Sequence, residues 1–491
     1  MDKPSVLRRL PSAADLLESP PLKRLVNRVS RNVVVDGVRS FLDDLRTDVQ
    51  RRTGELNVPP VREIAERIAD RILRGQQPEV RSVVNATGLV VHSALGCPPL
   101  PEEAIEELIE SAREYASVAL DLASGERRGR FREIEQRLCK LTGAESALVV
   151  NSHPGAVWLV LAALAAGRDV LVSRSQLGEN ETGYRVSDAV TVSGAVLREV
   201  GSANLTRGED YDTAAGEATA AILRVRTTSF FPIGLTGEAS LEELVRLGRK
   251  RQVPVVDDLG SSSLIDLARL GLAGEPNVAE SIRTGADLVL CSGEGLVGGP
   301  QCGLIFGRRA LVERIAAHPL IHAQGVSKLT ALALAATVRL YGDEQLAVRT
   351  VPLLQLLETP VENLKHRAER LQPQLAAAEV VAQAEALATE ANGGSTPLPH
   401  RRLPSYCLAL TPARGSAEEL SRQLRLGHPS VLGRVEDKRL LLDLRSVFPR
   451  QDQDLVDAVA ALGSSTTSTS TVIPVRATEE EATDHGSSAS I

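Results

Sequence analysis

Residues 287–307 read DLVLCSGEGLVGGPQCGLIFG: an apolar run, a glycine-rich loop and a second apolar run. Continuous runs of Val, Leu and Ile predict strands that are buried on both faces of a sheet. The predicted strands are 147–150, 169–172, 220–225, 253–256, 287–290 and 302–307. One helix is predicted to begin at residue 155, and another to span residues 241–249. Strands that alternate with helices indicate an α/β fold with a mostly parallel sheet, which we assign to a large domain over residues 81–340.

The segment before this sheet, residues 1–80, has the apolar spacing of a helical domain. Two prolines at 59 and 60 interrupt the pattern, and residues 61–73 then read as an amphipathic helix. This segment carries 15 Lys and Arg against 12 Asp and Glu, a net charge of +3, whereas the whole chain carries −7. Two interpretations stay open: solvated helix faces, or a surface that contacts RNA phosphates.

The segment after the sheet, residues 341–462, predicts a small α+β domain. We expect helix over 345–395, a loop at 393–397, and strands at 406–411, 431–434 and 440–444. Beyond Gly463 the chain is rich in Ser, Thr and Glu and lacks the apolar residues that a core needs. Residues 463–491 are therefore predicted to be a disordered tail.

Composition excludes several classes of function. With 491 residues, 43% of them hydrophobic and 24% charged, the chain has ordinary globular usage. Aromatic residues make up only 2%, so a stacking platform for single-stranded nucleic acid is not expected. The net charge argues against nucleic-acid binding over the whole surface, and no DNA partner is expected. The longest apolar stretch, 155–167, is too short to span a bilayer and predicts a buried helix, so no membrane partner is expected.

The cysteines show neither CxxC spacing nor a close histidine pair, and no targeting segment is visible. They are Cys97, Cys139, Cys291, Cys302 and Cys407. This scatter predicts neither a disulfide framework nor a zinc site, so no metal is expected and the reducing cytoplasm is the expected location.

Polar residues that follow the predicted strands are the candidates for a site, because ligands bind at the carboxyl ends of strands in such sheets. Ser152 and His153 open the helix after the first strand, where free N–H groups favour a phosphate; an ordinary N-cap is the alternative. Asp258 follows the strand at 253–256 and is of the type that holds a pyridinium nitrogen protonated; a turn cap is the alternative.

The order of an Asp strand, a glycine-rich loop and a further strand resembles the cofactor segment of fold-type-I pyridoxal-phosphate enzymes. The chain as a whole resembles the bacterial L-seryl-tRNA(Sec) selenium transferases, the selenocysteine synthases. The matching stretches are VNATG at 84–88, HSALG at 92–96, LTGAE at 141–145, EVGSANLT at 199–206, DLGS at 258–261, GGPQ at 298–301, KLT at 328–330 and LPS at 403–405. The resemblance runs from about residue 6 to 462.

This resemblance implies a transferase of the fold-type-I class with a helical N-terminal domain that contacts tRNA. It implies conversion of seryl-tRNA(Sec) to selenocysteinyl-tRNA(Sec) with selenophosphate, a step of selenocysteine and protein biosynthesis, with pyridoxal 5′-phosphate as cofactor. It also implies a homo-oligomer built of dimers, with sites at the dimer interfaces. The residues that it assigns to cofactor binding are Asp258, Ser152, His153, Ser292, Asn204 and Arg174.

Position 295 departs from the family pattern. The family motif Ser-Gly-Asp-Lys reads SGEG at 292–295, so Gly295 stands where the family has its catalytic Schiff-base lysine. Glycine has no amine, and covalent attachment of the cofactor is therefore not expected. Lys250 and Lys328 are the neighbouring lysines, and both are distant in sequence.

Other departures remove charge from the expected site. Relative to the family pattern, arginines are missing at Cys97, Leu205, His322 and Gly325, an aspartate at Ser327, a glutamate at Gln176 and an asparagine at His153. Neutral side chains cannot replace the charged, bidentate hydrogen bonding of arginine to phosphate-like anions. The family residues that remain are Asp258, Arg174, Glu179, Arg185 and Asn204.

Three hypotheses follow. The first is an active selenium transferase or a related enzyme that modifies aminoacyl-tRNA. The second is a catalytically inactive paralogue, a pseudoenzyme that serves as a tRNA-binding, oligomerising or regulatory subunit. The third is a pocket that takes a non-covalent cofactor or another phosphorylated ligand. The resemblance favours the first, and the missing amine at Gly295 favours the second.

Overall fold

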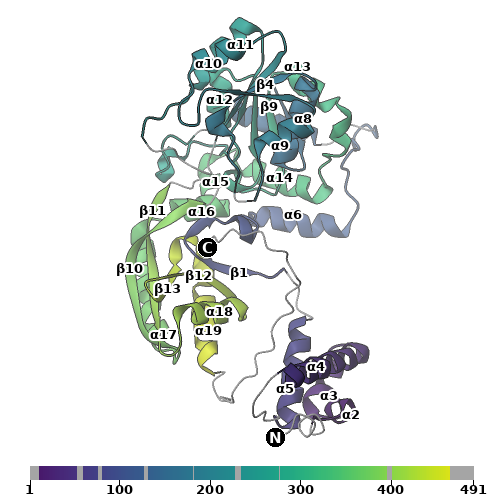
Figure 1. Ribbon diagram of the computed structural model, residues 1–491, viewed down its shortest axis with the longest axis vertical. Coiled ribbons are helices and arrows are strands. Elements are labelled where there is room, and N and C mark those ends of the chain that lie inside the picture. The colour runs from purple at the N-terminus through teal and green to yellow at the C-terminus, as the bar shows by residue number, and fades with distance from the viewer. Residues whose placement is uncertain are drawn as a thin grey trace. The chain divides into compact units, whose positions relative to one another are not determined.

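The computed structural model of the chain divides into an N-terminal unit that ends at Ser82 and a larger unit, Val83–Gly463 (Figure 1). It describes residues 10–51, 59–75, 80–126, 131–180, 182–226, 234–275, 277–394 and 401–464. The predicted disordered tail lies, except for its first two residues, outside this described part and stays a prediction.

The N-terminal unit is helical, as predicted. Its helices are α2 (Ala13–Leu17), α3 (Pro20–Val26), α4 (Arg31–Arg51) and α5 (Val61–Gly75). Apolar side chains from all four helices form one core, in which Leu22, Val38 and Ile68 are fully buried. The helical spacing of these residues is what brings them to one side of each helix.

A seven-stranded sheet forms the centre of the large unit. Its strands are β3 (Ser146–Val150), β4 (Asp169–Ser173), β5 (Val196–Val200), β6 (Thr219–Val225), β7 (Val255–Asp258), β8 (Leu288–Ser292) and β9 (Gly303–Gly307). The strand order is β3-β9-β8-β7-β6-β4-β5; β9 runs antiparallel to both of its neighbours, β3 and β8, and the other adjacent pairs are parallel. The predicted α/β class with a mostly parallel sheet is confirmed; β5, an edge strand, is the one strand of this sheet that the prediction missed.

Helices cover both faces of this sheet, which is why its strands are apolar throughout. The helices of this region are α6 (Glu102–Arg113), α7 (Arg132–Thr142), α8 (His153–Ala165), α9 (Val186–Val192), α10 (Gly208–Ala214), α11 (Leu241–Arg251), α12 (Val278–Thr284), α13 (Arg309–Ala316), α14 (Lys328–Leu340), α15 (Glu344–Thr350) and α16 (Pro352–Glu358). Helices α8, α9 and α13 pack on one face, and α7, α11, α12 and α14 on the other. Helix α8 is the predicted apolar helix and is buried along most of its length.

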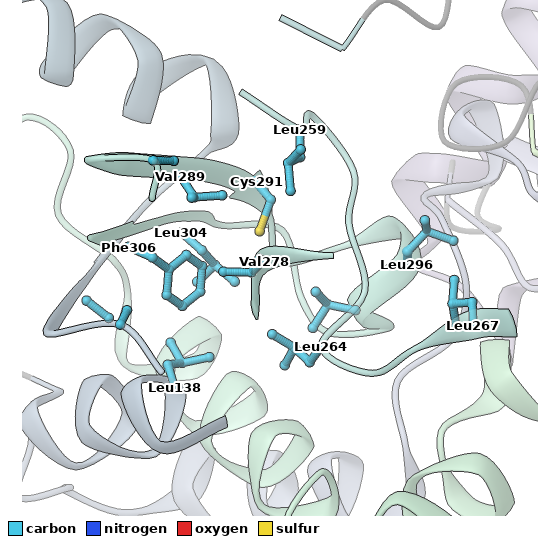
Figure 2. Packing of buried hydrophobic residues seen from close by; sticks show 14 of the residues in the cluster. Leu138, Leu259, Leu264, Leu267, Val278, Val289, Cys291, Leu296, Leu304 and Phe306 are labelled. Carbon is cyan, nitrogen blue, oxygen red and sulfur yellow. The ribbon is translucent and has the colours of Figure 1, made fainter. Parts of the chain in front are cut away.

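Figure 2 shows part of the hydrophobic core on the face of the sheet that α7, α11, α12 and α14 cover. Leu304 and Phe306 of β9 lie with Val289 of β8 in the cluster that also contains Leu138 of α7. Leu296, from the glycine-rich loop, belongs to the same cluster, so the loop is anchored to the interior by an apolar side chain.

Short 3₁₀ helices occupy several of the connections. They are η1 (Ser93–Leu95), η2 (Arg174–Gln176), η3 (Leu267–Leu270), η4 (Gly295–Val297), η5 (Pro319–His322), η6 (Leu444–Ser446) and η7 (Pro449–Gln451). Two of them, η2 and η4, lie at or just beyond the carboxyl ends of β4 and β8, where a site is expected.

A second, six-stranded sheet completes the large unit. Its strands are β1 (Val83–Ala86), β2 (Leu89–Val91), β10 (Val381–Gly394), β11 (Arg402–Pro412), β12 (Ser430–Glu436) and β13 (Arg439–Asp443), in the order β1-β12-β13-β11-β10-β2. Helices α17 (Val361–Ala376), α18 (Ala417–Leu426) and α19 (Asp452–Ser464) contribute apolar side chains to its core. Strands β1 and β2, from the start of the segment predicted as the large domain, pair with β12 and β10 of this sheet.

The predicted helix over 345–395 is wrong at its C-terminal end, and so is the start of the predicted loop at 393–397. Residues 381–394 form β10, which pairs with β11 along nearly its full length. Its sequence, VAQAEALATEANGG, is rich in Ala and Glu and therefore has helical propensity, but pairing within the sheet overrides that propensity. In the part of the chain that the structure describes, no helix is long and apolar enough to cross a membrane.

Candidate functional site

Asp258 and His153 meet at the carboxyl edge of the seven-stranded sheet. Asp258 ends β7 and its side chain is 1% exposed. His153 is the first residue of α8, and its Nε2 lies 2.6 Å from Asp258 Oδ1. The backbone N–H of Gly260 donates to the same oxygen at 3.0 Å. Asp258 Oδ2 is buried and has no hydrogen-bond partner among the described residues.

Glu294 adds a second carboxyl group beside His153. Burial lowers the pKa of His153, but the charges of Asp258 and Glu294 and the hydrogen bond to Asp258 outweigh it, so the pKa is raised above its ordinary value. Burial raises the pKa of Glu294, and His153 and a hydrogen bond from Cys97 offset part of that rise. The two carboxyl groups, one at the end of β7 and one in the loop after β8, therefore favour the protonated form of His153.

The loop that carries Gly295 is tightly built. Ser292 closes β8, its N–H donates to Gly260 O at 2.7 Å, and its Oγ accepts from the N–H of Glu294 at 3.2 Å. Gly295 has φ +64°, and a Cβ at this position lies 2.6 Å from Ser261 Oγ. That hydroxyl also accepts the N–H of Leu296 at 3.1 Å. The backbone at 295 has thus adopted a conformation that suits glycine and disfavours any side chain.

The two lysines named from the sequence have partners elsewhere. Lys328 Nζ donates to the backbone oxygens of Ser111 and Glu114, each at 2.9 Å. Lys250 Nζ pairs with Asp212 at 2.8 Å. Neither ammonium group is directed to the loop at 295 by these contacts.

Of three further residues predicted for the site, one adjoins the His153–Asp258 pair and two have hydrogen-bond partners elsewhere. Ser152 is the N-cap of α8, and its Oγ accepts the N–H of Gly155 at 3.1 Å, so it adjoins His153. Arg174, in η2 after β4, pairs with Glu199 at 2.9 Å and is half exposed. Asn204, beyond β5, donates to Leu235 O at 2.5 Å. The structure therefore brings Asp258, His153, Ser152, Ser292 and Gly295 together, and it gives Arg174 and Asn204 partners in other parts of the fold.

The sequence interpretation missed two contributors to the centre. Glu294 stood inside the quoted motif, one position before the missing lysine, and its acidity was the available signal. Tyr184 carried no signal; burial and the nearby Asp258 raise its pKa, and its hydroxyl is buried without a partner among the described residues. Cys97 was noted as a lost arginine, and the structure shows that its thiol donates to Glu294.

Pyridoxal phosphate can be tested against these residues. The unpartnered Asp258 Oδ2 suits the protonated nitrogen of a pyridine ring, and the start of α8 at Ser152 suits a phosphate. Gly295 offers no amine, and His153 already occupies Asp258 Oδ1. The residues therefore do not fit a covalently attached cofactor. No group of three His, Cys, Asp or Glu side chains arranged to hold a metal ion occurs within the described ranges.

Comparison with known proteins adds the wider context. The sequence pattern described as L-seryl-tRNA selenium transferase matches residues 83–448, and the pattern described as selenocysteine synthase N terminal matches residues 7–46. The L-seryl-tRNA(Sec) selenium transferase of Carboxydothermus hydrogenoformans is 38% identical over 448 residues, covering 91% of this chain and 95% of that protein. The enzyme of the same name from Geobacter metallireducens is 39% identical over 465 residues, covering 94% and 99%.

Among solved structures, D-glucosaminate-6-phosphate ammonia-lyase matches with a TM-score of 0.55 at 18% identity. The match covers 78% of this chain and 97% of the lyase chain. At that identity the likeness shows a shared fold.

Proposed function

Because the chain belongs to the L-seryl-tRNA selenium transferase family, we propose that it acts on seryl-tRNA(Sec) in selenocysteine formation, in the cytoplasm. The observation that carries this proposal is the extent of the match. Both the helical N-terminal unit and the large unit are covered, and the full-length relatives are 38–39% identical to this chain. The match therefore extends over both units of the chain.

Family membership also supports pyridoxal 5′-phosphate as the cofactor, bound here without a covalent link. When bound, the group supplies an electron sink for bonds to the carbon that carries the amine. Asp258 is the residue that would hold its ring nitrogen, and Ser152 and the first N–H groups of α8 its phosphate. As in the expectation from the sequence, the assembly is proposed to be a homo-oligomer built of dimers.

The N-terminal unit is proposed to contact the tRNA. Its excess of Lys and Arg over the first 80 residues supports contact with phosphates, since binding of nucleic acid depends on that charge. Affinity of the purified full chain for seryl-tRNA(Sec) that falls steeply with rising salt is the expected result. Affinity equal to that for unrelated tRNAs at every salt concentration would refute a role in selecting this substrate.

A second candidate function is favoured by one specific observation, the conformation of Gly295. A position with φ +64° and a serine hydroxyl 2.6 Å from the place of a Cβ is built for glycine, which fits a subunit that binds tRNA or partners without turnover. The two functions separate in one assay with purified protein, seryl-tRNA(Sec), selenophosphate and pyridoxal phosphate. Selenium recovered in the aminoacyl ester supports the transferase. Specific tRNA binding with no selenium transfer supports the non-catalytic subunit.

A further inference from the structure

The carboxylate at the centre of the site is already engaged by the chain itself. Asp258 is almost fully buried, and its Oδ1 receives both His153 Nε2 at 2.6 Å and the Gly260 N–H at 3.0 Å. A buried carboxylate needs a positive or hydrogen-bonding partner, since an unpaired buried charge is costly. His153 meets that need without any ligand.

The imidazole is surrounded by acidic groups from separate elements. Asp258 comes from β7, and Glu294 precedes η4; both charges favour the imidazolium form of His153. Tyr184 also lies near Asp258, and Cys97 lies against Glu294. Asp258 and Glu294 thus both favour a positive charge on His153.

A protonated pyridine ring requires the same carboxylate. A second cation brought to Asp258 is repelled by the imidazolium, since like charges at one buried site disfavour each other. Such a ring would approach the unpartnered Asp258 Oδ2 while His153 holds Oδ1, so the ring and the imidazole would share one carboxylate, and a positive charge on either disfavours the other.

We propose that His153, through its contact with Asp258 Oδ1, competes with the pyridinium ring of pyridoxal phosphate and related pyridine phosphates for the Asp258 carboxylate. The ring then meets a carboxylate that already has a partner supplied by the chain itself. This inference rests on the cofactor named in the proposed function, but not on the proposed action on seryl-tRNA(Sec).

The opposite arrangement makes the opposite prediction. If the imidazole instead lay against the face of the bound ring, it would contribute to binding, and its removal would weaken the affinity. The sign of the change on removing His153 therefore decides between competition and support.

The test measures binding of pyridoxine 5′-phosphate to the full chain by equilibrium dialysis. This probe has the pyridine ring and the phosphate but no aldehyde, so lysines elsewhere cannot capture it. We expect His153→Ala and His153→Asn each to bind it at least tenfold more tightly than the wild type. His366→Ala is the matched control, because His366 is 67% exposed on α17, and its affinity should equal that of the wild type.

Adding Asp258→Asn to His153→Ala should abolish the gain in affinity for pyridoxine 5′-phosphate, because the carboxylate that the first change frees is then absent. The His153→Asn variant keeps a polar side chain at the start of α8 and serves if the alanine variant does not fold. Unchanged or weaker binding in the folded His153 variants, or a gain that survives Asp258→Asn, would overturn the proposal. None of these outcomes involves tRNA or selenium, so they are independent of the test of the proposed function.

Discussion

Replacing Gly295 with alanine is expected to destabilise the large unit by about 2–3 kcal/mol. Placing a non-glycine residue in the left-handed region costs roughly 1–2 kcal/mol, and Gly295 has φ +64°. The new Cβ also lies 2.6 Å from Ser261 Oγ, which must move and lose its hydrogen bond from Leu296, at a cost of about 1 kcal/mol. The free energy of unfolding in urea measures the sum.

Gly143 provides the matched control for this prediction. It ends α7 with φ +76° and has no heavy atom within 4 Å of the place of its Cβ. Gly143→Ala should therefore cost only the backbone contribution, about 1–2 kcal/mol. Combining Ser261→Gly with Gly295→Ala should cost less than the sum of the single changes, since the two side chains then no longer collide.

A Gly295→Ala variant within about 0.5 kcal/mol of the wild type would refute the argument, since only a relaxed backbone at 295 allows that result. Gly295→Lys carries the same cost. Any borohydride-reducible adduct of pyridoxal phosphate that this variant gains should therefore come with lower stability than the wild type.

Three further changes test the interior. Burial raises the pKa of Glu135 from 4.5 to about 7, although a hydrogen bond from the Val149 backbone lowers it in part. Between these two pH values the folded state keeps a proton that the unfolded state loses, so stability falls as the pH rises through this range. Glu135→Gln should therefore exceed the wild type in free energy of unfolding by about 3 kcal/mol at about pH 8 and by little at about pH 4, and a pH-independent difference would contradict this reasoning. Arg445→Met should cost about 3 kcal/mol in urea unfolding, because its buried guanidinium donates to backbone oxygens that include Thr359 O at 2.6 Å; a neutral effect would show that those oxygens find other donors. Leu171→Ala, at a fully buried position of β4, should lower the thermal midpoint with a loss of about 3 kcal/mol, and a loss under about 1 kcal/mol would indicate that the core collapses around the gap.

The central sheet could be predicted because its strands are short, apolar and separated by helices. The strand at 147–150 and the helix after it carry no competing signal, and the structure confirms both. β5 was missed because VLREV, at the sheet edge, has mostly exposed side chains and so lacks the apolar run that marks the inner strands. β10 was mistaken for helix because the prediction used only the Ala and Glu content of the segment itself. Its strand conformation depends on pairing with β11, a separate segment of the chain.

The candidate site was predictable residue by residue but not as an arrangement. Asp258 and His153 were each identified from their places after strands. Their contact joins positions 105 apart in the chain, and either residue alone had an ordinary capping interpretation. The effect of Glu294 on His153 depends on how the loop after β8 folds back, which spacing does not reveal. Arg174 and Asn204 were placed with the site by resemblance, and their hydrogen bonds lie with other parts of the fold.

The residues at positions 153 and 295 can be considered together through the charges of the nearby carboxyl groups. The resemblance to the family implies that a carboxyl group is kept at Glu294, that an amine is absent at Gly295 and that an imidazole stands in place of an asparagine at His153. Without an amine at 295 and without His153, the buried carboxylate of Asp258 would have no positive partner, which is unfavourable. His153, 2.6 Å from Asp258, is such a partner, and Asp258 and Glu294 both act to raise its pKa. The contact with His153 thus accounts for how Asp258 is accommodated in this site, and it is the same contact that we propose opposes a cationic ring at Asp258.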